Sequence, residues 1–184
     1  LYDERNGGQM DFDFKKSQSE QALYGIGIKV NRVNAFSKIG FIFNKPNTSL
    51  GIITTWSLFD RNSFYGFNTY DATQQNGYLN AIYDSYLGNE KHKYSAGISA
   101  VIDRMKATFN TIPTGYNEII PGAFFEYNYL PSPDFSLLAG LRYDYSSLHG
   151  SFITPRLHAK YHFPAYVTLR AAAGKGYRTA NALA

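Results

Sequence analysis

The sequence predicts an all-β, antiparallel fold that crosses a membrane as a segment of a β-barrel. Apolar and polar residues alternate with period two through much of the chain, which is typical of strands with two different faces. Aromatic residues reach 17%, with 16 Tyr and 14 Phe against one Trp. No run approaches the roughly 20 apolar residues of a transmembrane helix. Barrel strands place only every second residue in lipid, so their signal is alternation instead.

The clearest alternation lies in the C-terminal half. Residues 135–145, 153–163 and 167–173 each place apolar side chains on one face, with Leu138 an exception on the other. The opposite rows carry polar and charged side chains, which suits a water-filled barrel interior. The residues expected to face the lumen, or a domain inside it, are Glu126, Arg142, Asp144, Arg156, His158 and Arg170. The three arginines are expected to pair with carboxylates there.

The same pattern extends upstream through residues 121–129, 96–102, 79–87 and 52–58. Apolar residues also alternate at 24–30 and again at 39–43, but in opposite phase. Either one long strand contains a bulge there, or a turn separates two strands. The chain therefore predicts seven or eight strands.

Connections of two lengths are expected between these strands. Short turns are predicted at Asn44–Ser49, Gly88–Lys91, Pro131–Asp134 and around Pro164, and Ser146–Ser151 is also short. Longer links are predicted over Arg61–Gln75 and Met105–Asn117. In outer-membrane barrels short turns face the periplasm and long loops face outside. Gly88–Lys91 and Pro131–Asp134 are therefore expected to be periplasmic, and Phe64–Thr73 and Thr108–Tyr116 extracellular.

The predicted extracellular loops carry candidate ligand-binding residues. Tyrosine offers a rigid, half-apolar surface with a hydroxyl group, and binding residues are often found on loops of a rigid scaffold. The candidates are Arg61, Tyr65, Tyr70, Tyr116 and Asn117. The alternative is that these tyrosines only pack the loops or lie at the membrane boundary.

A soluble β-sandwich or lipocalin-like barrel would also alternate. The apolar rows, however, end in aromatic residues at Tyr129, Tyr145 and Phe163, as expected for the aromatic girdles of a membrane barrel. Pro155 within a strand is unusual, because proline cannot donate to a ladder, and a bulge there would accommodate it.

Enzymatic and metal chemistry is not indicated. The chain has no cysteine and no G-x-S-x-G motif. His158 and His162 share a face but lie ~13 Å apart along a strand, too far to chelate one ion together. The net charge of +4 is not concentrated in a basic block, which argues against a nucleic-acid partner. We therefore expect no enzyme, no catalytic residue, no cofactor and no metal.

Four ordered motifs carry a resemblance to a known family. GAFFEY at Gly122–Tyr127, GLRYD at Gly140–Asp144, TPR at Thr154–Arg156 and LRAAAGKGYR at Leu169–Arg178 follow one another at hairpin spacing. In this order they resemble the barrel of TonB-dependent receptors of the bacterial outer membrane.

The resemblance implies a 22-stranded barrel plugged by an N-terminal domain, with residues 1–184 forming about a third of the barrel. The plug domain and the closing strands are expected to lie outside this chain. It further implies uptake of a scarce nutrient, of the ferric siderophore or cobalamin class. The implied partners are outer-membrane lipid, the receptor's own plug, a TonB-type energy-coupling protein and the small nutrient ligand. Two alternatives stay open: a self-contained eight-stranded barrel with a structural or adhesive role, and a soluble carbohydrate-binding β-domain.

Overall fold

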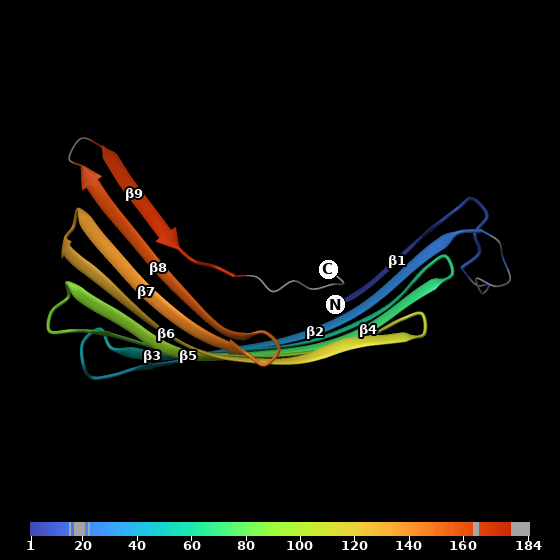
Figure 1. The fold of residues 1–184 in the computed structure, drawn as a ribbon, viewed down its shortest axis with the longest axis horizontal. Coiled ribbons are helices and arrows are strands. Elements are labelled where there is room, and N and C mark those ends of the chain that lie inside the picture. Colours follow the sequence, from blue (N-terminus) through green and yellow to red (C-terminus); the bar gives the residue numbers. More distant parts are fainter. Residues whose placement is uncertain (15, 17–20, 22, 164–165, 178–184) are drawn as a thin grey trace. The chain divides into compact units, whose positions relative to one another are not determined.

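A computed structural model describes residues 1–184 except 15, 17–20, 22, 164–165 and 178–184, and its described part contains strands and turns but no helix. Nine strands form one sheet in which neighbours in sequence are neighbours in space (Figure 1). The strands are β1 (Tyr2–Gly8), β2 (Gly25–Ile42), β3 (Ser49–Tyr65), β4 (Asn68–Tyr86), β5 (His92–Phe109), β6 (Ile112–Ser132), β7 (Phe135–Ser146), β8 (Gly150–Phe163) and β9 (Val167–Gly174).

The expected antiparallel all-β architecture is confirmed, but the count of seven or eight strands is wrong. No alternation predicts β1, which mixes charged residues and glycines and pairs antiparallel with Gly25–Asn31 of β2. The phase change between 24–30 and 39–43 lies inside one continuous strand, β2, so of the two alternatives the long strand is confirmed and the turn is wrong. β1 and β9 are the edge strands of the described sheet, which therefore does not close as an eight-stranded barrel.

The chain divides into two compact units. The first comprises residues 1–36, 55–77 and 102–118, and the second comprises 37–54, 78–101 and 119–184. The first unit contains β1 and the hairpin ends of β3–β4 and β5–β6, whereas the second contains β7, β8 and β9 entire.

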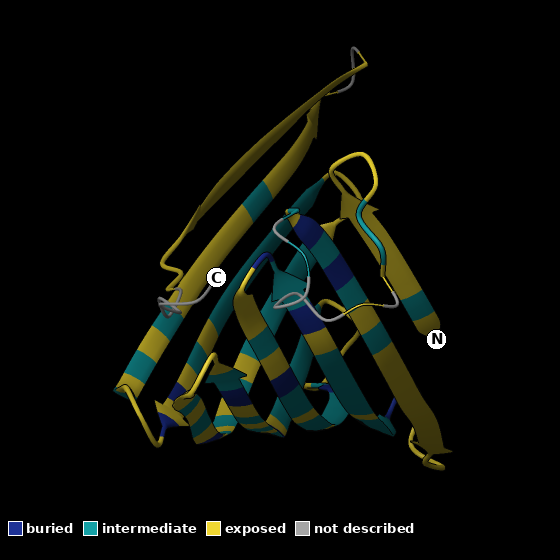
Figure 2. Ribbon diagram, turned by 90° about the vertical axis from the view of Figure 1, so that its right-hand side faces the viewer, coloured by how far each residue is buried: buried dark blue, intermediate teal, exposed yellow. Residues whose placement is uncertain are grey.

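In the second unit the predicted two-faced strands are present. The register pairs Phe125 with Leu141 and Leu141 with Pro155, so these side chains share one face. Ala139 likewise pairs with Leu157, which pairs with Ala173. We call this the apolar face, and the opposite side, which carries Arg142 and Arg156, the polar face. Large side chains on the apolar face are half exposed, including Leu141 (55%), Ile153 (55%), Leu157 (48%) and Leu169 (60%). Figure 2 shows β9 exposed along its length and β8 exposed with short intermediate bands.

In the first unit the two predicted long loops, Phe64–Thr73 and Thr108–Tyr116, are wrong. Both segments are β-hairpins closed by two-residue turns, Gly66–Phe67 and Asn110–Thr111. The first residue of each turn has a positive φ, 60° at Gly66 and 55° at Asn110, which glycine and asparagine adopt most readily.

Strand length explains why the sequence pattern does not predict these hairpins. β2 to β6 contain 17 to 21 residues each, whereas a membrane crossing needs only about 9–11. At the hairpin ends both faces carry polar side chains, so the backbone pairing continues while the alternation disappears.

The strand register is irregular at Pro131 and not, as expected, at Pro155. The register across Pro155 is unbroken, so the expected bulge is absent. The Pro155 carbonyl accepts a hydrogen bond from the Lys175 amide, just past the end of β9, and the missing N–H falls on that same side. A register shift occurs instead between Tyr129 and Ser132, at Pro131. The turn predicted around Pro164 falls partly on residues 164–165, outside the described residues, as does the motif residue Arg178.

Candidate functional site

An arginine–carboxylate pair lies at the centre of the polar face in the second unit. Arg142 donates two hydrogen bonds of 2.7 Å to the two Asp144 oxygens and a third, also 2.7 Å, to Ser99 Oγ on β5. Asp144 is buried, with 5% of its surface exposed, while the Arg142 side chain is about a third exposed (37%). The bidentate geometry fixes both side chains at one position on the sheet.

Gly122 leaves the space that this pair occupies. It lies directly opposite Asp144 in the β6–β7 ladder. A Cβ at position 122 would meet the Asp144 carboxylate, and would approach the Arg142 guanidinium and Ser99 Oγ to 3.0 Å. A glycine is therefore required here by close packing of a charged pair.

We predict that Gly122→Ala lowers the free energy of unfolding of the full-length protein by about 1–2 kcal/mol, because the added methyl group displaces the Asp144 carboxylate. Gly51→Ala is the matched control, since a Cβ at position 51 of β3 would meet nothing within 4 Å. Chemical denaturation of both variants measures the difference. Equal effects would show that glycine is not needed beside Asp144.

A second group of charged residues on the polar face lies on β6, β8 and β9. Arg156 is hydrogen-bonded to Glu126 across the sheet. Arg156 and two further predicted lumen residues, His158 and Arg170, line a cavity of about 580 Å³. The predicted polar-face set thus forms two ion pairs, Arg142–Asp144 and Arg156–Glu126, together with a basic cavity.

In the first unit, three predicted ligand-binding residues come together on one face of the β3–β4 hairpin. The Arg61 guanidinium donates a hydrogen bond to the Tyr65 hydroxyl and lies 5.4 Å from the centre of the Tyr70 ring, within cation–π range. Ser63, between Arg61 and Tyr65 on the same face, donates to the Tyr70 carbonyl at 2.9 Å. These residues lie in strands and not in loops, so the rigid sheet holds their side chains.

Tyr116 forms a separate polar group on β6. Its hydroxyl donates to Asp103 at 3.0 Å, and Gln74 donates to the same carboxylate at 2.9 and 3.1 Å. Tyr116 lies near the turn of the β5–β6 hairpin, outside the apolar face defined above. Burial, reinforced by the Asp103 hydrogen bond and charge, raises the pKa of Tyr116 to about 12. The hydroxyl therefore remains a proton donor throughout the physiological pH range.

Asn117 does not join these residues. It follows Tyr116 in β6, so it points to the other side of that strand, where its exposed side chain accepts a hydrogen bond from Arg104 at 3.3 Å. The predicted five-residue ligand site is thus not one cluster, and the prediction that its members lie in loops is wrong.

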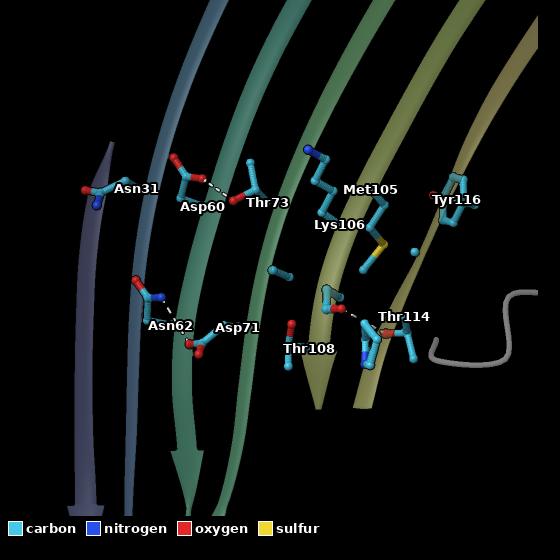
Figure 3. Close-up of a pocket in the computed structure, with 14 residues that line it drawn as sticks. Asn31, Asp60, Asn62, Asp71, Thr73, Met105, Lys106, Thr108, Thr114 and Tyr116 are labelled. Atoms are coloured by element: carbon cyan, nitrogen blue, oxygen red, sulfur yellow. Dashed lines mark hydrogen bonds between the residues drawn. The ribbon is translucent and has the colours of Figure 1, made fainter. Parts of the chain in front are cut away.

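The opposite side of β3 carries polar pairs that line a cavity of about 920 Å³ in the first unit. Thr73 donates to Asp60 at 2.8 Å and Asn62 donates to Asp71 at 3.0 Å, as Figure 3 shows. Both faces of this hairpin are therefore polar, as expected for a segment outside lipid.

Aromatic side chains gather near the turns of the second unit. His92 stacks on Tyr129 and Tyr127, with ring centres 5.1 and 6.0 Å apart, and Tyr161 packs edge-on against Phe163 at 4.6 Å. Tyr127, Tyr129 and Tyr161 belong to the apolar face, where such clusters match an aromatic girdle.

Several contributors to these sites were not identified from the sequence as site residues. Ser99 is 43 residues from its partner Arg142. Asp103 and Gln74 are 13 and 42 residues from Tyr116, so only the strand register reveals these neighbours. Among the described residues no group of three or more His, Cys, Asp or Glu could hold a metal ion. No helix of the described residues is long and apolar enough to cross a membrane.

An antiparallel sheet with one half-exposed apolar face, an aromatic border and a charged opposite face defines a membrane β-barrel protein. The family model "TonB dependent receptor-like, beta-barrel" matches residues 2–184. The chain therefore belongs to the TonB-dependent receptor-like β-barrel family.

A solved structure with a similar fold is the siderophore receptor PirA from Pseudomonas aeruginosa. It is 15% identical to this chain, with a TM-score of 0.61, and the match covers 87% of this chain and 31% of that receptor. The chain thus spans about a third of the length of that receptor, and the likeness concerns the fold. A comparison with curated proteins finds no match.

Proposed function

We propose that this chain is the barrel segment of an outer-membrane receptor that takes up a scarce nutrient of the ferric siderophore or cobalamin class. Its membership of the receptor family supports transport in general. The observation that carries ligand capture is the rigid Arg61–Tyr65–Tyr70 group, which combines a cation, two hydroxyl-bearing rings and a strand scaffold. PirA, a siderophore receptor by name, is consistent with this substrate class.

In this proposal the apolar face contacts outer-membrane lipid and the polar face lines the lumen. The β3–β4 and β5–β6 hairpin ends then project into the extracellular medium, because both of their faces are polar and their strands exceed the length of a crossing. Turns Leu87–Lys91 and Pro133–Asp134 lie at the opposite, periplasmic ends. The energy-dependent step requires a plug domain and a TonB-type coupling protein in the full-length receptor.

Ligand capture can be tested through the two tyrosine groups. Replacing Tyr65 and Tyr116 together by Ala in the full-length receptor is expected to weaken nutrient binding by roughly 1–3 kcal/mol, because each removes a rigid contact surface and a hydroxyl donor. Isothermal titration with ferric siderophores and cobalamin measures affinity, and a melting curve confirms that the barrel remains folded.

Asn117→Ala serves as the control, since Asn117 lies on the other side of β6 and contacts Arg104. We expect its affinity to equal that of the wild type. Unchanged affinity in the double tyrosine variant would place the binding site elsewhere in the receptor, and a folded receptor that binds neither nutrient class would contradict the proposed substrate.

A further inference from the structure

Two positive side chains face each other directly on the polar face of β8 and β9. The register pairs Lys160 with Arg170, so both project from the same side of the sheet, where opposed side chains have Cβ atoms about 4.5–5.5 Å apart. Both are exposed. Like charges in this arrangement are destabilising unless a negative group lies between or above them.

The surroundings add positive charge and hydrogen-bond donors. Lys160 and Arg170 line the 580 Å³ cavity together with Arg156 and His158. Asn128 and Ser136 contribute an amide and a hydroxyl group to the same lining. None of the described residues that line it carries a carboxylate. Glu126 compensates Arg156 alone, which leaves Lys160 and Arg170 without an acidic partner in the described lining.

Small residues create the hollow above β9. His158 lies opposite Ala172 and Arg156 lies opposite Gly174, so β9 presents short side chains where β8 presents long ones. The cavity can therefore accept a bound group instead of being filled by neighbouring side chains. Its volume suits a compact small molecule.

We propose that this cavity, which we call the β8–β9 site, binds a small multivalent oxyanion such as a polycarboxylate or a polyphosphate. Two facing cations with amide and hydroxyl donors at the margin provide charge-assisted hydrogen bonds to at least two oxyanion groups. The inference goes beyond nutrient capture at the β3–β4 hairpin, since it concerns different strands, a different unit and a different ligand chemistry.

The test uses the purified full-length receptor with citrate and inorganic pyrophosphate as probes, at low ionic strength, where such attraction is least screened. Wild-type receptor should bind a probe and melt at a higher temperature in its presence. The Lys160→Gln/Arg170→Gln double variant should bind at least tenfold more weakly. Lys160→Arg, which keeps the charge, should retain binding within about threefold.

Arg104→Gln/Lys106→Gln is the matched control, because it removes one Arg and one Lys from exposed positions on β5. It should leave probe affinity unchanged. Absence of probe binding to the wild type would overturn the proposal, as would an equal loss in the control, which would indicate nonspecific attraction to net charge.

A folding readout separates the site from general damage. Without a probe, Lys160→Gln should melt no lower than the wild type, because it removes a like-charge contact. With a probe, the wild type should gain more thermal stability than Lys160→Gln. If Lys160→Gln alone lowers the melting temperature without any probe, an acidic group of the receptor itself already occupies the site, and the proposal fails. Nutrient affinity at the tyrosine groups is measured separately and can fail independently of this result.

Discussion

Leu157→Arg in the full-length receptor is expected to destabilise the folded barrel by about 2–4 kcal/mol, whereas Thr154→Arg should destabilise it by less than about 1 kcal/mol. Leu157 lies on the apolar face of β8, opposite Ala139 of β7 and Ala173 of β9, and is half exposed. An arginine there would carry its charge into the hydrocarbon. Thr154 lies three residues away on the polar face, opposite Arg142, which Asp144 already neutralises.

Refolding titrations into lipid vesicles measure both variants under the same conditions. The two variants form a matched pair, because both positions lie on β8 but on opposite faces of the sheet. Equal losses of stability for Leu157→Arg and Thr154→Arg would mean that the apolar face does not meet lipid. That result would favour the alternative of a soluble β-domain.

Alternation made the second unit predictable. The strands over 135–145, 153–163 and 167–173 were placed correctly from the sequence, because there one face is apolar and the other polar. A one-residue slip of such a strand would move every apolar side chain to the wrong face, so the pattern also fixes the register.

The first unit was less predictable for a physical reason. At the hairpin ends both faces carry polar side chains, and Asp60, Arg61 and Asn62 follow one another without alternation. Backbone hydrogen bonds hold these segments as strands, and such bonds do not require side chains of alternating polarity. β1 could not be predicted for the same reason, since its pairing with β2 depends on the backbone and on partners 17 to 29 residues away.

Only part of the Arg142–Asp144 site could be predicted from the sequence. Arg142 and Asp144 are two residues apart on one strand, so their shared face could be read from the sequence. Ser99 and Gly122 come from other strands, and their roles depend on register. The opposition of Lys160 and Arg170 is likewise a property of the β8–β9 pairing.

Asp144→Ala is expected to lower the stability of the full-length receptor by about 2–3 kcal/mol. Removing one partner of a fully buried pair typically costs about 3–5 kcal/mol, because the remaining charge loses its compensation. Arg142 is about a third exposed and keeps its hydrogen bond to Ser99, so the expected effect is smaller. Asp71→Asn provides a control, since this exposed carboxylate accepts a hydrogen bond from Asn62, and its loss should change stability by less than about 0.5 kcal/mol.

A double-mutant cycle isolates the pair from the rest of the sheet. Arg142→Gln/Asp144→Asn replaces both charged groups by neutral amides and so removes the ion pair. The double variant should be more stable than the sum of the two single changes predicts, by at least about 1 kcal/mol. Additive single effects would show that water on the polar face screens each charge independently. In that case Gly122 would provide space for the carboxylate alone, and the Arg142–Asp144 bond would contribute little to holding β7 in place.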